Sequence, residues 1–385
     1  MKRRLFTPGP TPVPEEITLA MAAPLPHHRT PEFQETMRRT HELLQRVYRT
    51  PDPVVVLSAS GTGAMEAAVV NLTHPGEKVL SVNGGKFGAR WGELLCTFGR
   101  DVEELQIAWG ESVTPEQVHD GLSRSGARIV FVTHSETSTA ALCDLQQISQ
   151  VTRDLDAVLV VDAITSLGAH RLETQRWDLG CVIGGSQKAF MMPPGLSFLS
   201  LSERARARID GNPTPRYYFD LNKALQGVGQ GRTPFTPAIS LLLGLERSCQ
   251  RILEEGLEAV WLRHQLLADA VRAGAAAMRL KPVATRPSNA VTAVYAPDGT
   301  SADAVRDCVW RRFGIKLAGG QGSLLGRILR IGHLGAYDAA DVLQVLCALE
   351  EALHEHGHPV QPGAATAAAR SSLAQLDAVP QRGAP

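Results

Sequence analysis

Short apolar runs alternate with amphipathic stretches over the first half of the chain. The first run of strand length is Val54–Ser58, and further runs follow near residues 79–82, 102–107, 129–133, 158–162, 181–184 and 196–201. Helical periodicity falls between most of them, at 62–73, 87–98, 115–124 and 145–154. Continuous apolar strands separated by helices predict an α/β fold whose mostly parallel sheet is covered on both faces.

The pattern changes near residue 238. Long helices are expected at 238–254 and 257–274, and a smaller α+β unit follows, with strands near 291–295 and 327–332 and helices near 301–313 and 338–356. We therefore expect a large domain over residues 16–255 and a small C-terminal domain over 256–358. From Pro359 the chain is rich in Pro, Gly, Ala, Ser and Gln without apolar periodicity, which favours a disordered tail over 359–385.

The N-terminus is expected to form an ordered arm over residues 1–15. Pro8, Pro10, Pro12 and Pro14 exclude a helix or a central strand here, because proline lacks the amide donor and favours extended backbone. A disordered tail is the alternative, and the helical pattern that begins at Glu32 argues against it.

Composition excludes several classes of protein. With 39 basic and 39 acidic residues the formal charge is zero, so no basic excess favours nucleic acid. The six cysteines are scattered without a CxxC pair, which fits neither a metal site nor a disulfide framework and favours a reducing cytoplasm. No signal peptide follows the basic start, and no run approaches the roughly 20 apolar residues of a membrane span.

A carboxylate and an amine each follow a buried strand. Asp162 ends the run Ala157–Val161, and Lys188 closes Gly184–Lys188 after Cys181–Ile183. Taken singly, a strand-terminal Asp often caps a helix, and a lone Lys is usually solvated. Together they suit pyridoxal phosphate (PLP), whose aldehyde forms a Schiff base with an amine and whose pyridine nitrogen is kept protonated by a carboxylate.

Two glycine-containing loops offer further candidates. Ser58–Gly63 links the first strand to the first helix, where free N–H groups and the helix dipole suit a phosphate, although a simple Ser N-cap is the alternative. Asn83–Gly88 leaves Phe87 as its one bulky residue, which could stack on a flat ring or simply belong to the core.

Polar residues at two other strands complete the set. Thr133–Thr139 is dense in hydroxyl groups at the carboxyl end of a strand, the edge where open α/β sheets bind ligands, although a solvated turn has a similar composition. Arg330 stands between Leu329 and Ile331, where its guanidinium could grip a carboxylate through two hydrogen bonds or pair with an internal acid.

Taken together, these residues resemble the class V aminotransferases of the fold type I PLP enzymes, in particular the alanine–glyoxylate and serine–pyruvate aminotransferases. The resemblance extends over nearly the whole chain, and its motifs occur in the family order and spacing. They are Thr7–Thr11, Ser60–Gly61, Ser186–Lys188, Pro193–Gly195 and Leu329–Gly332.

The resemblance implies a role for each candidate. Lys188 would be the Schiff-base lysine, and Asp162 the partner of the pyridine nitrogen. Phe87 and Ile164 would lie on opposite faces of the ring, and Thr137 would bind its phenolic oxygen. Ser60, Gly61, Thr62 and Gln187 would hold the phosphate. Arg330 would bind the substrate α-carboxylate, with Gly9 of the arm also at the substrate.

The family also implies a homodimer in which a loop of the neighbouring subunit completes the phosphate site. That loop corresponds to Gly231–Pro237. Many relatives carry Tyr-His-His-Thr there, and this chain lacks the Tyr, so either Thr236 or Thr233 would take its place.

The implied reaction is a ping-pong transamination between a small L-amino acid (alanine, serine or aspartate) and glyoxylate or another small 2-oxo acid. The rivals are another fold type I reaction, such as desulfuration or elimination, and a PLP-binding protein without turnover. A desulfurase needs a reactive Cys on a mobile loop, whereas Cys308 and Cys347 lie in helical patterns. Arg29 could meet a second carboxylate, as aspartate would require, or be solvated.

Overall fold

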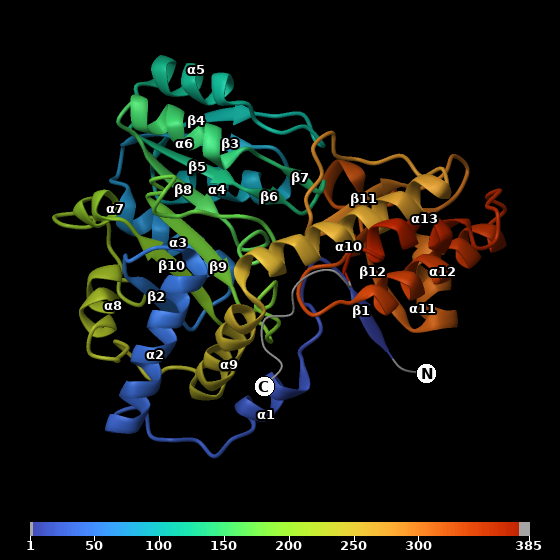
Figure 1. Cartoon of the computed structure of the whole chain (residues 1–385). Helices are drawn as coiled ribbons and strands as arrows, with labels where there is room; N and C mark the ends of the chain where they lie inside the picture. Colours follow the sequence, from blue (N-terminus) through green and yellow to red (C-terminus); the bar gives the residue numbers. More distant parts are fainter. Residues whose placement is uncertain (1–2, 377–385) are drawn as a thin grey trace.

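The computed structural model describes residues 3–376 and contains a seven-stranded sheet at the centre of its larger part (Figure 1). The strand order is β2-β10-β9-β8-β5-β3-β4. All neighbours are parallel except β10, which is antiparallel to both β9 and β2, so the expectation of a mostly parallel sheet is confirmed. The strands are β2 (Val54–Leu57), β3 (Lys78–Asn83), β4 (Asp101–Gln106), β5 (Ile129–Thr133), β8 (Val158–Asp162), β9 (Cys181–Gly185) and β10 (Ser197–Leu201).

Helices cover both faces of this sheet, which explains why its central strands are apolar without interruption. Along β5, Val130 and Val132 belong to one hydrophobic core, whereas Ile129 and Phe131 belong to the core on the other face. Phe131 packs against Trp91 of α4, with ring centroids 4.9 Å apart. The surrounding helices are α2 (Pro31–Tyr48), α3 (Gly61–Leu72), α4 (Lys86–Thr97), α5 (Pro115–Ser125), α6 (Leu145–Asp154) and α9 (Ile239–Glu255).

A second sheet of four strands has the order β1-β12-β13-β11 and its own hydrophobic core. Its strands are β1 (Arg4–Phe6), β11 (Val291–Tyr295), β12 (Ile315–Gly319) and β13 (Ile328–Gly332), with helices α10 (Leu257–Ala277), α11 (Ala302–Phe313) and α12 (Ala339–Glu355). β1 is an edge strand, parallel to β12. The proline-rich arm therefore starts on the small sheet and runs to the large one, where the Thr11 hydroxyl donates to the Lys188 carbonyl at 2.9 Å.

Several short elements lack a sequence signal. They are α1 (Glu15–Met21), β6 (Ser135–Glu136), β7 (Ala141–Leu142), α7 (Glu203–Ala207), α8 (Leu221–Val228), the 3-10 turn Gly322–Leu324 and β12. Of these, the β6–β7 hairpin bears on the predicted site, because Glu136 ends β6 and Thr137 begins the turn that joins β6 to β7.

The expectation of a disordered tail is wrong for α13 (Ala364–Leu373). Ala365, Ala369 and Leu373 are buried against the small-sheet core. Alanine is the strongest helix former, and its small side chain allows close packing, so low complexity concealed an amphipathic helix. The remainder of that expected tail, residues 377–385, lies outside the described residues.

Among the helices of residues 3–376, none combines the length and apolar character needed to cross a membrane.

Candidate active site

Lys188 follows β9 and lies beneath the N-terminal arm. Its Nζ donates a hydrogen bond of 2.6 Å to the Pro8 carbonyl. Gly9 has φ +141°, and a Cβ there would lie 2.6 Å from Lys188 Nζ, so only glycine lets the arm pass this amine. Burial lowers the pKa of Lys188 to about 8, although the charge of Asp162 opposes this shift and that of Arg330 adds to it.

Asp162 ends β8, the strand next to β9 in the sheet. The two strands are parallel, with Asp162 paired to Ile183, so Asp162 and Lys188 emerge at the same sheet edge. The Asp162 carboxylate accepts the Ile164 N–H at 3.0 Å. Burial raises the pKa of Asp162 to about 6, the nearby Glu136 charge raises it further, and Lys188 and Arg90 oppose the rise.

The N-terminus of α3 lies beside these residues and has the features of an anion site. Ser60 is the N-cap, but its side chain makes no capping bond. Within residues 3–376 the N–H groups of Gly61 and Thr62 have no acceptor. A Cβ at Gly61 would lie only 2.3 Å from Ile164 Cδ1. The start of α3 therefore packs closely against the loop that follows Asp162. Free N–H groups at a helix start, with its positive dipole end, suit a phosphate.

Gln187 adds a second polar group to the same place. Its Oε1 is buried without a hydrogen-bond partner in the described chain. A Cβ on Gly185 would lie 3.3 Å from this oxygen and 3.1 Å from Ile164 Cγ2. The described chain makes no hydrogen bond to the Gln187 amide, so its NH2 group can join the free N–H groups as a donor to an anion.

Phe87 is half-buried in the first turn of α4. The Arg90 guanidinium lies 4.9 Å from the centre of its ring and donates to the Thr62 hydroxyl at 3.0 Å. Arg90 therefore links the aromatic ring to the α3 N-terminus, and its charge acts on Asp162.

Arg330 reaches from β13 of the small sheet to the β6–β7 hairpin, which is a separate two-stranded sheet. Its Nε donates to the Gly319 carbonyl at 2.8 Å and its Nη1 to the Thr137 carbonyl at 2.7 Å. Burial lowers the pKa of Arg330 to about 10, which leaves it charged at neutral pH. Among residues 3–376 it forms no ion pair within 4 Å, although the charge of the buried Glu136 raises its pKa. Its Nη2 makes no hydrogen bond there and is available to an anion.

The side chains of the hydroxyl-rich segment 133–139 lie in two different places. Thr137 is buried, and its hydroxyl makes no hydrogen bond within residues 3–376. His134 turns elsewhere: its ring nitrogen Nδ1 lies 2.9 Å from the Ser166 hydroxyl, and with His170 it lines a separate cavity of about 310 Å³. Thr137 is thus the member of this segment that the structure brings beside Arg330.

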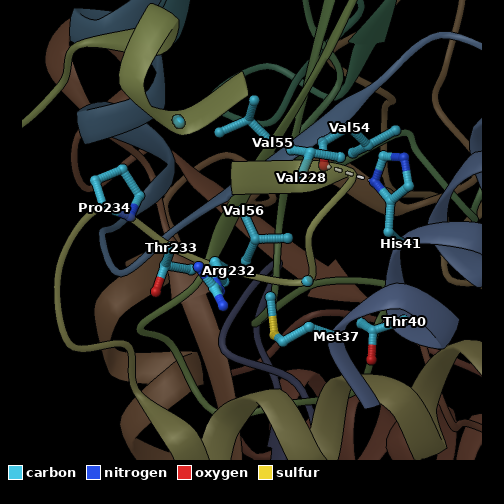
Figure 2. A pocket seen from close by; sticks show the side chains of 12 residues that line it. Met37, Thr40, His41, Val54, Val55, Val56, Val228, Arg232, Thr233 and Pro234 are labelled. Carbon is cyan, nitrogen blue, oxygen red and sulfur yellow. Dashed lines mark hydrogen bonds between the residues drawn. The ribbon is translucent and has the colours of Figure 1, made fainter. Parts of the chain in front are cut away.

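Two predicted residues lie apart from the Lys188 cluster. Thr236 is exposed in loop 231–237, which flanks grooves along β2. Figure 2 shows the neighbouring groove, where Arg232, Thr233 and Pro234 face Val56 and Met37. Arg29 is exposed on the surface, where its Nε donates to the ring of His28 at 3.4 Å.

Three groups were missed by reasoning from the sequence: the Pro8 carbonyl, Arg90 and Glu136. Pro8 and Lys188 are 180 positions apart, so their contact leaves no local signal. Glu136 does have one, since it is the single carboxylate within the hydroxyl-rich segment after a buried strand.

The comparisons with known proteins agree with this arrangement. Residues 5–339 match the family model "Aminotransferase class-V". The chain is 41% identical over 379 residues to "Soluble hydrogenase, small subunit" of Synechococcus sp. (strain PCC 6716), covering 97% of this chain and 98% of that protein. It is 35% identical to L-aspartate–glyoxylate aminotransferase of Paracoccus denitrificans (strain Pd 1222), covering 98% of each.

A solved structure is similar over the same extent. The aspartate aminotransferase of subgroup IV from Thermus thermophilus superposes with a TM-score of 0.86 at 35% identity, covering 92% of this chain and 99% of the other. The chain belongs to the class-V aminotransferases. It is accordingly a transaminase with the α/β architecture of the fold type I PLP enzymes.

The family implies PLP as the cofactor, and the residues present fit it. A phosphate suits the free N–H groups of α3, a pyridine nitrogen suits the buried Asp162 carboxylate, and an aldehyde suits an amine whose pKa is lowered.

Proposed function

We propose that this protein is a PLP-dependent aminotransferase that moves an amino group from a small L-amino acid (alanine, serine or aspartate) to glyoxylate or another small 2-oxo acid by a ping-pong mechanism. The observation that carries the proposal is the emergence of Asp162 and Lys188 at one sheet edge, beside the free N-terminus of α3. The named activity of the Paracoccus relative supports the acceptor.

When bound, PLP supplies an aldehyde that condenses with amines and a protonated ring that accepts electrons. Asp162 holds the proton at the pyridine nitrogen. Lys188 takes the proton from the donor's Cα and delivers it to the cofactor's C4′, acting as base and then as acid. A pKa of about 8 suits both roles, because neither form of the amine is rare near neutral pH.

The other cofactor-binding residues are proposed to contact three parts of PLP: its phosphate, its ring and its phenolic oxygen. Ser60, Gly61 and Thr62 hold the phosphate from the α3 N-terminus, and Gln187 assists them. Phe87 and Ile164 would contact the ring from opposite sides, and the Thr137 hydroxyl would bind the phenolic oxygen.

Arg330 binds the α-carboxylate of donor and acceptor in turn. Its backbone hydrogen bonds fix Nε and Nη1 and leave Nη2 to donate to the substrate carboxylate. Gly9 leaves room beside the Lys188 amine, so that substrate and lysine can both approach the reacting carbon.

We further propose a homodimer in which Thr236 or Thr233 of one subunit completes the phosphate site of the other. The exposed position of Thr236 supports this, since within one chain the loop reaches the β2 grooves instead of Lys188. We place the large domain at residues 16–255 and the small domain at 256–358, and we propose a cytoplasmic protein.

The rival reactions find less support from the geometry. Cys143, Cys181, Cys249 and Cys308 are buried, whereas Cys96 and Cys347 are exposed on α4 and α12. None stands on a loop over Lys188, where a desulfurase needs its thiol.

A panel of half-reactions tests the substrate assignment. Alanine, serine and aspartate are each mixed with PLP-loaded protein, and glyoxylate, pyruvate and oxaloacetate with the pyridoxamine phosphate form. We expect rapid conversion by at least one small donor and by glyoxylate. Conversion by bulky donors alone would reject the substrate class while leaving transamination intact.

A further inference from the structure

The N-terminus of α4, which carries Phe87, is capped by a distant part of the chain. Its own N-cap is Gly85, which has no side chain to do so. Instead, the Phe87 and Gly88 N–H groups both donate to Glu136 Oε2 at 2.9 Å. The Lys86 N–H donates to the Ser138 hydroxyl at 3.1 Å. Groups that a helix normally satisfies locally are here satisfied by the β6–β7 hairpin.

Both carboxylate oxygens of Glu136 accept hydrogen bonds in this cap. Its Oε1 accepts the Ser138 N–H at 3.0 Å and the Ser138 hydroxyl at 2.5 Å. The side chain is only 5% exposed, and within residues 3–376 it forms no ion pair. A buried carboxylate without a cation is costly unless hydrogen bonds and a helix dipole compensate, and the α4 N-terminus supplies both.

Gly85 shows that this approach is built into the sequence. A Cβ at Gly85 would lie 2.5 Å from Ser138 Oγ and 2.7 Å from Glu136 Cδ. Any other residue would push the hairpin away from α4. The glycine of this loop thus admits Glu136 and is not required by a turn, since its φ lies outside the left-handed region.

We propose that Glu136, together with Ser138, is a positioning residue that fixes Phe87 against the cofactor ring and Thr137 against its phenolic oxygen. This inference rests on the proposed function. Two hydrogen bonds donated by consecutive N–H groups to one oxygen fix the backbone at Phe87, and therefore the direction of its side chain. Thr137 lies between the two capping residues, and its carbonyl receives Arg330. One carboxylate thus ties together three groups that meet cofactor or substrate.

The effect of the Glu136 charge on nearby groups is consistent with the place of Glu136 beside the site. The Glu136 charge raises the pKa of both Asp162 and Arg330. The carboxylate therefore lies near both ends of the site without belonging to the set that contacts the ligands.

Glu136→Gln is the test, and Glu350→Gln is its matched control. Glu350 is also a buried carboxylate that caps another helix from a distance: it accepts the N–H groups of Gly363 and, at 2.8 Å, Ala365 at the start of α13. In either variant the amide nitrogen cannot accept a hydrogen bond. It replaces an oxygen that accepts two hydrogen bonds in Glu136 and one in Glu350. Both variants should lower the melting temperature of the cofactor-free protein.

Only Glu136→Gln should change the cofactor site. We expect its PLP affinity to fall about tenfold, the equivalent of one charge-assisted hydrogen bond. The visible circular dichroism of bound PLP should weaken, and the donor KM should rise. Glu350→Gln should retain the wild-type PLP affinity and dichroism.

Ser138→Ala and Phe87→Leu keep the test decisive if Glu136→Gln does not fold. Ser138→Ala removes two hydrogen bonds of the cap but retains the carboxylate, so PLP affinity should fall in the same direction by less. Combined with Phe87→Leu, the losses in PLP affinity should be less than additive, because both act through one ring.

The proposal is overturned if Glu136→Gln matches Glu350→Gln in PLP affinity and dichroism, or if losses with Phe87→Leu add fully. Those results leave transamination by the wild type standing. Failure of the wild type to bind PLP would instead reject the proposed function and this inference with it.

Discussion

Arg330 donates a hydrogen bond of 2.7 Å to the backbone carbonyl of Thr137. This bond joins β13 of the small sheet to the segment after β6 in the large part of the molecule. The residue proposed to grip the substrate is thereby held at a fixed place beside a residue proposed to contact the cofactor. Orientation of the donor relative to the cofactor then follows from the fold itself.

Arg330→Lys should raise the donor KM and lower kcat/KM, although the charge is retained. A lysine cannot bind the Gly319 and Thr137 carbonyls and at the same time offer a carboxylate a fixed N–H donor, the role proposed for Nη2 of Arg330. The loss of one charge-assisted hydrogen bond corresponds to about 1.5–3 kcal/mol, or roughly ten- to a hundredfold in kcat/KM. Arg327→Lys, at an exposed position next to the same strand, is the control. Unchanged kinetics with alanine, serine and aspartate would remove Arg330 from the substrate site.

Lys188→Ala should abolish transamination while the protein remains folded. Within residues 3–376 the amine makes a single hydrogen bond, to Pro8, and burial already disfavours its charge, so its loss costs little stability. Borohydride treatment should fix PLP covalently to the wild-type protein but not to the variant, as read by mass spectrometry. Lys78→Ala, an exposed lysine at the start of β3, serves as the control. Wild-type turnover by the Lys188 variant would disprove the assignment.

Asp162→Asn should still bind PLP but react far more slowly with a donor. An amide cannot hold the proton at the pyridine nitrogen electrostatically, so the charge that develops on the donor carbon loses its sink. We expect the single-turnover rate to fall by at least about a hundredfold, the usual result of removing one electrostatic stabiliser. Stopped-flow absorbance of the bound cofactor measures this rate, and a rate near that of the wild type would count against the role.

The free energy of unfolding of the cofactor-free protein should fall as the pH drops below 6.5. Burial lowers the pKa of His170 and of His333 to about 3 from 6.5. Because the folded-state pKa is depressed, the unfolded chain binds protons first, and stability present above pH 6.5 is lost on acidification. Each histidine contributes up to about 1.4 kcal/mol per pH unit.

Asp162 opposes part of this loss. Its folded pKa, raised to about 6 from 3.8, makes the protein gain stability between these values as the pH falls. Lys188 changes nothing here, since both its folded and unfolded forms are protonated well below pH 8. Urea titrations at pH 5 and 7 test the sum. His333→Asn should flatten the dependence, whereas exposed His119→Asn should not; equal slopes in all three proteins would contradict the attribution to buried histidines.

The parts of the fold that the sequence predicts are those with local signals. The strands ending at Thr133 and Asp162 are apolar on both faces, and helices separate them, so both their presence in a parallel sheet and the sheet edge that carries the site follow from periodicity. The N-terminus of α3 follows equally from Ser60 and Gly61 at a strand–helix junction.

The remainder depends on contacts between distant positions. Glu136 acts on Phe87 across 49 positions, and Pro8 meets Lys188 across 180, so neither pairing has a local pattern. Helix α13 was not predicted because the composition of an alanine-rich stretch is the same in a packed helix and in a disordered segment. Only the contacts of Ala365 and Ala369 with the core show that this stretch is a packed helix. Loop 231–237 has its proposed partner in another subunit, which periodicity within one chain cannot reveal.

The central claim is that Lys188 and Asp162 operate a transaminase half-reaction, and addition of a donor amino acid without any 2-oxo acid tests it most directly. Absorbance spectra of PLP-loaded protein, with the released 2-oxo acid measured in parallel, should show one cofactor per subunit converted to pyridoxamine phosphate, after which the reaction stops. Glyoxylate should then restore the starting spectrum. An unchanged spectrum with every small donor, or continued release of 2-oxo acid and ammonia without an acceptor, would contradict the account.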